Sequence, residues 1–261
     1  MDYHAALAAL EWQVELGADE AIGETPVNRY ELPKVAPKPV IKTGPTSNIA
    51  PISQMPVIPV VQETAADIAR IMAGRCDTLS ALRDALAVFE HCALKKGARN
   101  LVFSDGNPSA RVMVIGEAPG REEDRSGRPF VGPAGQLLDR MFAAIGMTRE
   151  GEGAAGVYIT NVMPWRPPHN RDPEPEEIAM MMPFLERHIM LAAPDVVVLM
   201  GNTPCQAVLG KRGITRLRGN WTEAFGKPVM PMFHPAALLR DGLKKRDSWA
   251  DLLALNARLK G

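Results

Sequence analysis

From residue 110 onward, short apolar runs alternate with segments whose apolar positions recur at helical spacing. Apolar runs bounded by helical segments are typical of buried strands in a parallel sheet that helices cover on both faces. The pattern therefore predicts an α/β protein, a three-layer α/β/α fold with a central four-stranded parallel sheet. The four expected strands lie within residues 110–116, 157–162, 195–201 and 229–235, and the expected helices within 133–146, 175–193 and 203–210.

The part of the chain before residue 110 has a different pattern. Residues 63–94 have apolar positions at helical spacing and predict two helices, the second with Thr78 or Ser80 as its N-cap. Residues 23–61 carry a proline every few positions and no helical or strand period, which indicates an extended linker. We therefore expect an N-terminal helical segment (1–22), a Pro-rich flexible linker (23–61) and one main domain (62–261).

Composition narrows the class of protein. The chain has 261 residues and a 46% apolar content, enough for a sizeable core. No run approaches the roughly 18 apolar residues of a membrane span, and the first 20 residues lack the basic region of a signal peptide. We expect a cytoplasmic protein with no membrane partner. Its three cysteines form no CxxC pair, which favours reduced thiols and makes them poor metal ligands.

The formal net charge is zero, which argues against nonspecific coating of nucleic acid. The charges are unevenly distributed, because residues 201–261 hold about 11 Lys and Arg against about 4 Asp and Glu. The basic residues cluster within 211–219 and 238–246. This pattern fits either a solvated charged face or a surface that faces phosphates.

Polar residues follow the expected strands. Glu117 follows the first, Asn161 ends the second, Asn202 follows the third and His234 ends the fourth. Each has an ordinary structural explanation as a turn former, a helix cap or a surface histidine. Because the carboxyl ends of parallel strands meet at one edge, we expect a carboxylate, an amide and an imidazole to share one site.

The turn GEAPGR after the first strand resembles a phosphate-binding loop in position but not in charge. Glu117, Glu122, Glu123 and Asp124 would repel a phosphate, and the turn is not GxGxxG. No GxSxG nucleophile motif is present either. A carboxylate, an amide and an imidazole instead suit recognition of a neutral polar heterocycle and cleavage of a bond to it by water.

Four segments carry a family resemblance that covers nearly all of residues 78–259. The sequence resembles the family 4 uracil-DNA glycosylases in GEAPGREEDRSGRPFVGPAGQLLDRM, YITNVMPWRPPHNRDPEPEE, LMGNTPCQAVLG and FHPAALLR. The resemblance implies a DNA repair enzyme that flips uracil, and further deaminated bases as candidates, out of DNA and hydrolyses its N-glycosidic bond. It also implies that single- and double-stranded DNA containing uracil is the partner, and we expect the protein to act as a monomer.

The resemblance assigns three catalytic positions. Glu117 matches the first motif, where it is the candidate to position water or to stabilise the sugar cation. Glu123 resembles the second important acid of the family, and His234 resembles the histidine that stabilises the uracil anion.

The resemblance also assigns the uracil-binding positions. Phe130 resembles the aromatic residue that stacks on the flipped base, and Asn161 resembles the asparagine that reads it. Ala118 stands where other glycosylases carry an aspartate. Gly120 stands where some families place a tyrosine that excludes thymine, so selectivity among pyrimidines stays open.

One departure from the family is large. Family 4 enzymes usually carry four cysteines that hold a [4Fe-4S] cluster, and here only Cys92 falls on such a position. Phe89, Trp165 and Met181 stand at the other three. Large apolar groups can fill the space of a cluster, so we expect a cluster-free branch with no metal and no cofactor.

The segment after the fourth strand is the candidate DNA contact. We expect a loop with Leu238 or Leu239 as the wedge that enters the base stack, while the alternative is that both leucines start a helix and pack inward. The cations expected on phosphates are Arg240, Lys244, Lys245 and Arg246.

Two other classes of function stay open from the sequence. One is a noncatalytic uracil- or DNA-binding member of the same fold, and the other is an unrelated α/β nucleotide-binding protein. Uracil release from a labelled oligonucleotide distinguishes the enzyme from both.

Overall fold

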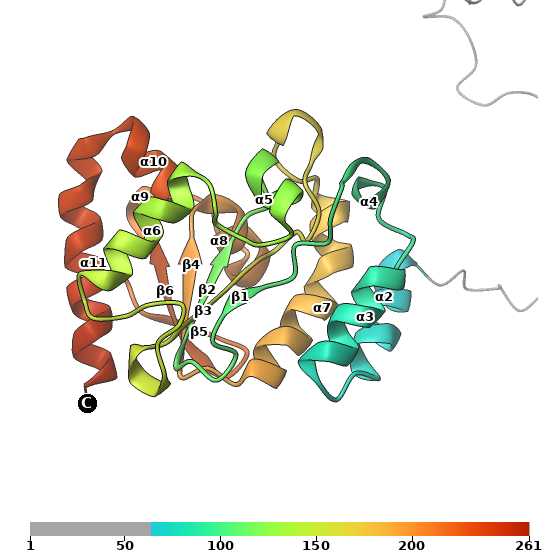
Figure 1. The fold of residues 1–261 in the computed structure, drawn as a ribbon, viewed down its shortest axis with the longest axis horizontal. Helices are drawn as coiled ribbons and strands as arrows, with labels where there is room; N and C mark the ends of the chain where they lie inside the picture. The colour runs from blue at the N-terminus through green and yellow to red at the C-terminus, as the bar shows by residue number, and fades with distance from the viewer. Residues whose placement is uncertain (1–63, 261) are drawn as a thin grey trace, which may run out of the picture. The chain divides into compact units, whose positions relative to one another are not determined.

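The computed structural model describes residues 64–260, which fold around one six-stranded sheet with strand order β1-β3-β2-β4-β6-β5 (Figure 1). The predicted helical segment at 1–22, the linker at 23–61, and the first two residues and the last residue of the predicted main domain lie outside the described residues. The described helices, with their 3-10 turns η1–η3, are α2 (Ala65–Gly74), α3 (Leu79–Val88), α4 (Leu94–Gly97), α5 (Arg121–Ser126), α6 (Pro133–Ala143), η1 (Gly153–Ala155), η2 (Pro168–Asn170), α7 (Pro175–Ala192), α8 (Asn202–Leu209), α9 (Ile214–Leu217), α10 (Pro235–Arg240), η3 (Gly242–Lys244) and α11 (Lys245–Leu259).

The four predicted parallel strands form the centre of the sheet. They are β2 (Val112–Gly116), β3 (Val157–Asn161), β4 (Val196–Met200) and β6 (Lys227–Met232). Their parallel pairing confirms the α/β class and the central strands. The register pairs Gly116 with Asn161, so the last residues of β2 and β3 lie side by side.

The prediction of a sheet with only four strands was wrong at both edges. The two-residue β1 (Asp105–Gly106) pairs antiparallel with β3, and β5 (Thr222–Ala224) pairs antiparallel with β6. Neither edge strand contains an apolar run, because an edge strand is only partly buried. A tight turn joins β5 to β6, with Phe225 and Gly226 both at positive φ.

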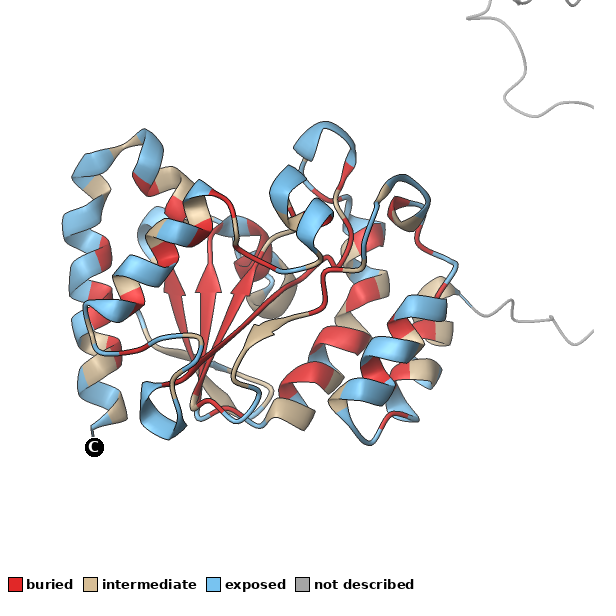
Figure 2. Ribbon diagram, in the orientation of Figure 1, coloured by how far each residue is buried: buried red, intermediate tan, exposed pale blue. Residues whose placement is uncertain are grey.

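Alternate residues of the strands face two separate apolar layers. Met113 and Ile115 of β2 belong to the layer that contains α2, α3 and α7. Val112 and Val114 point the other way, into the layer with α6 and α11. The strands β2, β3 and β4 are buried and the outer helix faces are exposed (Figure 2). The two layers hold the strands in place and leave their carboxyl ends free for a site.

The helices that precede the sheet begin at side-chain caps. The Oγ1 of Thr78 accepts from the backbone N–H of Ala81, which selects Thr78 and not Ser80 as the cap of α3. Thr64 and Asp67 form a reciprocal capping box at the start of α2.

The described residues contain no helix long and apolar enough to cross a membrane.

The three cysteines, Cys76, Cys92 and Cys205, are buried free thiols. Burial raises the pKa of the Cys205 thiol to about 12. These thiols are therefore protonated at neutral pH.

Candidate active site

The carboxyl ends of β2, β3 and β6 converge on a cavity of about 330 Å³. All seven residues predicted to act on the base or the water line it: Glu117, Ala118, Gly120, Glu123, Phe130, Asn161 and His234. Arg240, predicted to contact DNA, stands at the same cavity. The structure thus brings together residues that are up to 123 positions apart in the chain, from Glu117 to Arg240.

Glu117 is held by a residue that the sequence did not single out. The Oγ1 of Thr203, in the first turn of α8, donates to Glu117 Oε2 at 2.7 Å. Burial raises the pKa of the Glu117 carboxyl, and the bond from Thr203 opposes part of that rise. The carboxylate therefore has a fixed orientation and an elevated affinity for a proton.

His234 is fixed in one tautomer by the helix that it begins. Its Nδ1 accepts from the backbone N–H of Ala236 at 3.1 Å, as the N-cap of α10. Burial lowers the pKa of His234 to about 4, and the nearby Arg240 adds to the decrease. At neutral pH the ring is uncharged, and its proton is on Nε2 because Nδ1 is an acceptor.

The side chains of Phe130 and Asn161 both pack against Gly116. A Cβ on Gly116 would lie 2.4 Å from Asn161 Oδ1 and 2.5 Å from Phe130 Cζ, so only glycine fits there. The Phe130 ring also stacks on the His234 ring, with centroids 5.4 Å apart. No other side chain or backbone group between residues 64 and 260 hydrogen-bonds the side-chain amide of Asn161, which leaves its donor and acceptor free for a ligand.

Glu123, predicted to be catalytic, lines the cavity and is bound by backbone amides. Its Oε1 accepts from the backbone N–H groups of Val131 and Gly132, both at 2.9 Å. Its Oε2 accepts from Gly120 at 3.1 Å. Both carboxylate oxygens therefore accept hydrogen bonds from the backbone, two of them from the segment that follows Phe130.

A wider polar groove of about 400 Å³ adjoins the base cavity and shares Glu117, His234 and Arg240 with it. It adds Thr203 and Arg212, whose guanidinium lies 3.7 Å from Asp172 and is largely exposed. The predicted rim residue Asn202 lines this groove but not the base cavity, and its Oδ1 accepts from the backbone N–H groups of Gly213 and Ile214. Sequence reasoning missed Thr203, since a threonine one turn into a helix carries no distinctive spacing.

A model of the uracil DNA glycosylase superfamily matches residues 103–255. The chain belongs to this superfamily. The type-4 uracil-DNA glycosylase of Thermotoga maritima is 44% identical over 153 residues, which cover 58% of this chain and 77% of the relative. That of Archaeoglobus fulgidus is 43% identical over 157 residues (57% and 76%), and that of Sulfurisphaera tokodaii is 38% identical over 173 residues (62% and 76%).

The segment that follows His234 in this superfamily member is a helix, and the expected loop was wrong. Leu238 lies on the inner face of α10 with 1% of its surface exposed, so it cannot enter a base stack. Leu239 is 48% exposed, and Leu243, which the sequence analysis did not single out, is 90% exposed on η3. Its position among the basic residues of 240–246 could have identified Leu243 as a candidate DNA contact from the sequence.

The cations predicted to contact phosphates differ in whether they are already paired within the protein. Arg240, Lys245 and Arg246 are exposed. Lys244 is paired with Asp241 at 3.1 Å and also lies over the Phe233 ring. Its ammonium group is therefore partly engaged within the protein.

The residues at the expected cluster positions do not fit an iron-sulfur cluster. Phe89, Cys92, Trp165 and Met181 all belong to one apolar core, with at most 2% of each exposed. Within residues 64–260 no group of three or more His, Cys, Asp or Glu side chains could hold a metal ion. A [4Fe-4S] cluster takes four thiolates, and of the four expected positions only Cys92 offers a thiol.

Proposed function

We propose that the protein is a DNA repair glycosylase that flips uracil out of DNA and hydrolyses its N-glycosidic bond, leaving an abasic site. The observation that carries this proposal is the convergence of Phe130, Asn161, neutral His234 and Glu117 on one cavity. Membership of the superfamily and the type-4 relatives support it.

The cavity suits recognition of a flipped uracil. The Phe130 ring offers a stacking surface, and the free amide of Asn161 can donate to one ring atom and accept from its neighbour. Gly120 carries no side chain into the cavity. Added bulk there would collide with Glu123, since a Cβ would lie 2.7 Å from its Oε2.

The chemistry follows from the charge state of the two catalytic groups. The N1–C1′ bond breaks with its electron pair staying on uracil, and the Nε2–H of His234 donates to the carbonyl oxygen that receives the negative charge. The water oxygen bonds to C1′, while the Glu117 carboxylate orients the water, accepts its proton and stabilises the positive charge on the sugar. A neutral histidine donor does not need a proton from solvent at neutral pH.

Single-turnover release of labelled uracil from single- and double-stranded oligonucleotides tests the proposal. The same assay with hypoxanthine and thymine defines the range of bases. His234→Ala protein purified in the same way controls for a contaminating glycosylase. Uracil binding without release would instead support the noncatalytic alternative, and neither binding nor release would point to an unrelated nucleotide-binding protein.

We also propose that the enzyme works without an iron-sulfur cluster, since Phe89, Trp165 and Met181 fill the positions of three ligands. Anaerobically purified protein should be colourless and should contain far less than one iron atom per chain by elemental analysis. Visible absorbance that bleaches on reduction, together with stoichiometric iron, would contradict this expectation.

The DNA face that we propose extends from the cavity along α10 and η3. Arg212, Arg240, Lys245 and Arg246 would contact phosphates, and the exposed Leu243 is the wedge candidate beside Leu239. We propose that the protein makes these contacts as a monomer, with single- or double-stranded DNA.

The wedge can be tested by replacing the exposed Leu239 and Leu243 and, separately, the buried Leu238. Leu239→Ala with Leu243→Ala should lower excision from duplex roughly tenfold more than from single strands, because unstacking is needed only in the duplex. Leu238→Ala is the control, and it should cost about 2–5 kcal/mol of stability without changing the ratio of the two rates. Equal losses on both substrates for the exposed pair would exclude the wedge.

A further inference from the structure

The residue that stacks on the base has an unusual backbone. Phe130 has φ 54°, in the left-handed region that residues other than glycine seldom adopt. Such a conformation persists only where surrounding contacts hold it. The position of the Phe130 ring therefore depends on what holds residues 129–132.

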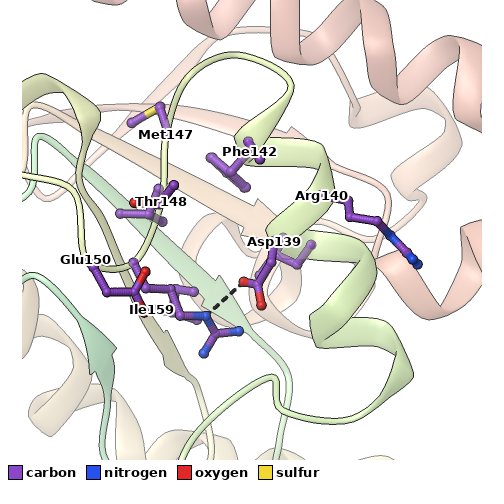
Figure 3. Close-up of a pocket in the computed structure, with 11 residues that line it drawn as sticks. Asp139, Arg140, Phe142, Met147, Thr148, Glu150 and Ile159 are labelled. Carbon is purple, nitrogen blue, oxygen red and sulfur yellow. Dashed lines mark hydrogen bonds and ion pairs between the residues drawn. The ribbon is translucent and has the colours of Figure 1, made fainter.

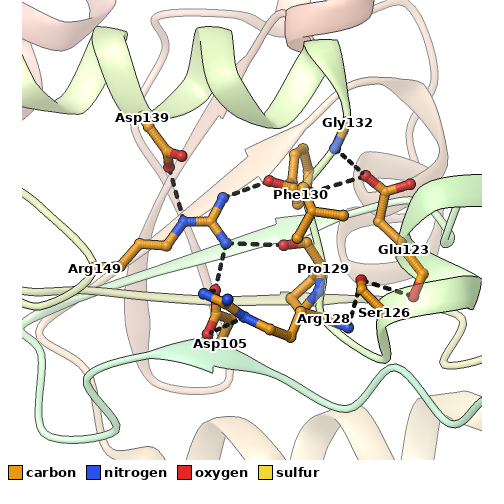
Figure 4. Close-up of polar contacts among 10 residues, drawn as sticks. Asp105, Glu123, Ser126, Arg128, Pro129, Phe130, Gly132, Asp139 and Arg149 are labelled. Atoms are coloured by element: carbon orange, nitrogen blue, oxygen red, sulfur yellow. Dashed lines mark hydrogen bonds and ion pairs between the residues drawn. The ribbon is translucent and has the colours of Figure 1, made fainter.

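Arg149 holds this segment on its carbonyl side. Its Nη1 donates to the carbonyl of Pro129 at 2.9 Å, and its Nη2 donates to the carbonyl of Phe130 at 2.5 Å (Figure 4). Glu123 accepts the next two backbone N–H groups from the other side, as described above. A guanidinium and a carboxylate thus hold consecutive carbonyls and amides of one short segment.

Arg149 is itself fixed in place. Asp139 of α6 accepts from its Nε at 2.8 Å, and Asp105 of β1 accepts from its Nη1 at 2.5 Å. Only 9% of the Arg149 side chain is exposed. Burial would raise the pKa of the Asp105 carboxyl, but bonds from Arg128 and Arg149 outweigh it and lower that pKa. The guanidinium is therefore held rigidly as a planar fork of donors.

Helix α6 closes the remaining side of the Phe130 carbonyl. A Cβ on Gly135 would lie 1.7 Å from that oxygen, so the helix backbone packs directly against it. The carbonyl thus lies between α6 and the guanidinium of Arg149, with no room to turn.

Arg149 reaches the segment from outside the base cavity. It lines a separate cavity of about 290 Å³ beside α6, whose walls include Asp139, Phe142 and Met147 (Figure 3). This cavity and the base cavity have no lining residue in common. Arg149 therefore does not line the base cavity, and among the described residues Phe130 is its one hydrogen-bond partner that does.

We propose that Arg149 is a positioning residue for base recognition, which keeps the Phe130 ring over the uracil by holding the carbonyls of Pro129 and Phe130. The role of the ring as a stacking surface rests on the function proposed above. The clamp itself, of Arg149 and Glu123 on residues 129–132, rests on the contacts of the segment.

A double-mutant cycle separates this role from general support of the fold. Arg149→Met should slow single-turnover uracil excision by about 10- to 100-fold, the range for loss of hydrogen bonds to a charged group. In a Phe130→Ala background the same change should cost less than about threefold, because the ring through which it acts is gone. Arg149→Lys keeps the charge between Asp105 and Asp139 but not the fork, and it should lose about tenfold.

Arg128 offers a matched control. It binds the same Asp105 but is 58% exposed and touches neither carbonyl, so Arg128→Gln should excise uracil within about twofold of wild type. All variants are compared at a temperature where circular dichroism shows them folded. An equal cost of Arg149→Met with and without Phe130, or wild-type rates for both Arg149 variants, would overturn the proposal.

Hydrogen–deuterium exchange of the peptide spanning residues 129–136 gives a readout that does not depend on catalysis. Exchange should accelerate in Arg149→Met and in Arg149→Lys but not in Arg128→Gln. If the wild type released no uracil while this pattern held, the clamp would stand and the proposed function would fall. Unchanged exchange in both Arg149 variants would remove the clamp whatever the activity.

Discussion

Replacing Glu117 with glutamine should slow uracil excision by about 10²- to 10⁴-fold, the usual contribution of a general base. Because burial raises the pKa of Glu117, the excision rate of the wild type should fall on the acid side at a pH above the ordinary carboxyl value of 4.5. The carboxylate is the active form, so the rate rises as the pH increases through this pKa. Single-turnover rates from pH 4.5 to 8 measure both effects.

Thr203 supplies the control for the pH dependence. Thr203→Val removes the hydrogen bond that favours the Glu117 carboxylate, so the acid limb should move to still higher pH. Thr203→Ser keeps the hydroxyl and should restore the wild-type profile. An acid limb that stays in place in Thr203→Val, or that survives in Glu117→Gln, would show that another group controls it.

Replacing His234 with alanine should slow excision by about 10²- to 10³-fold, as expected when one preorganised hydrogen-bond donor is lost from a water-poor site. Binding to uracil-containing DNA should change much less, because the charge on uracil develops only as the bond breaks. Single-turnover excision and equilibrium DNA binding, measured at the same pH and salt concentration, separate the two effects.

The helix cap made by His234 needs its own control. His234 Nδ1 caps α10, so alanine also removes a helix cap. Serine restores a capping oxygen, but its short side chain does not carry a donor to the position of the imidazole Nε2. His234→Ser should therefore recover stability without recovering rate. A His234→Ala enzyme within a few fold of wild type, or rescue of the rate by serine, would assign the histidine a structural role only.

The sequence predicted the parts of the fold that depend on long-range burial. The strands β2, β3, β4 and β6 could be predicted because each contains an apolar run, and their carboxyl ends located the site through Glu117, Asn161 and His234. The edge strands β1 and β5 could not, because two or three half-exposed residues carry no apolar period.

Other errors concern which way a side chain faces. Leu238 and Leu239 are adjacent in the chain and alike in chemistry, and only the helical turn of α10 buries the first and exposes the second. Glu123 was identified as functional, but the sequence did not indicate that its carboxylate accepts from backbone amides eight and nine residues later. The contact between Thr203 and Glu117 joins residues 86 positions apart, which no spacing rule detects.

The apolar core at the expected cluster positions affects how this fold is assembled in the cell. Phe89, Trp165 and Met181 fill that part of the core without any bound group, so the proposed cluster-free enzyme would fold there without iron delivery or sulfide transfer. The neighbouring Cys92 thiol is buried and its pKa is raised by that burial, which keeps it protonated and slow to react with peroxides. In the proposed cluster-free enzyme, iron starvation and oxidants, which disable cluster-bearing proteins, would therefore have little chemistry to act on in this region.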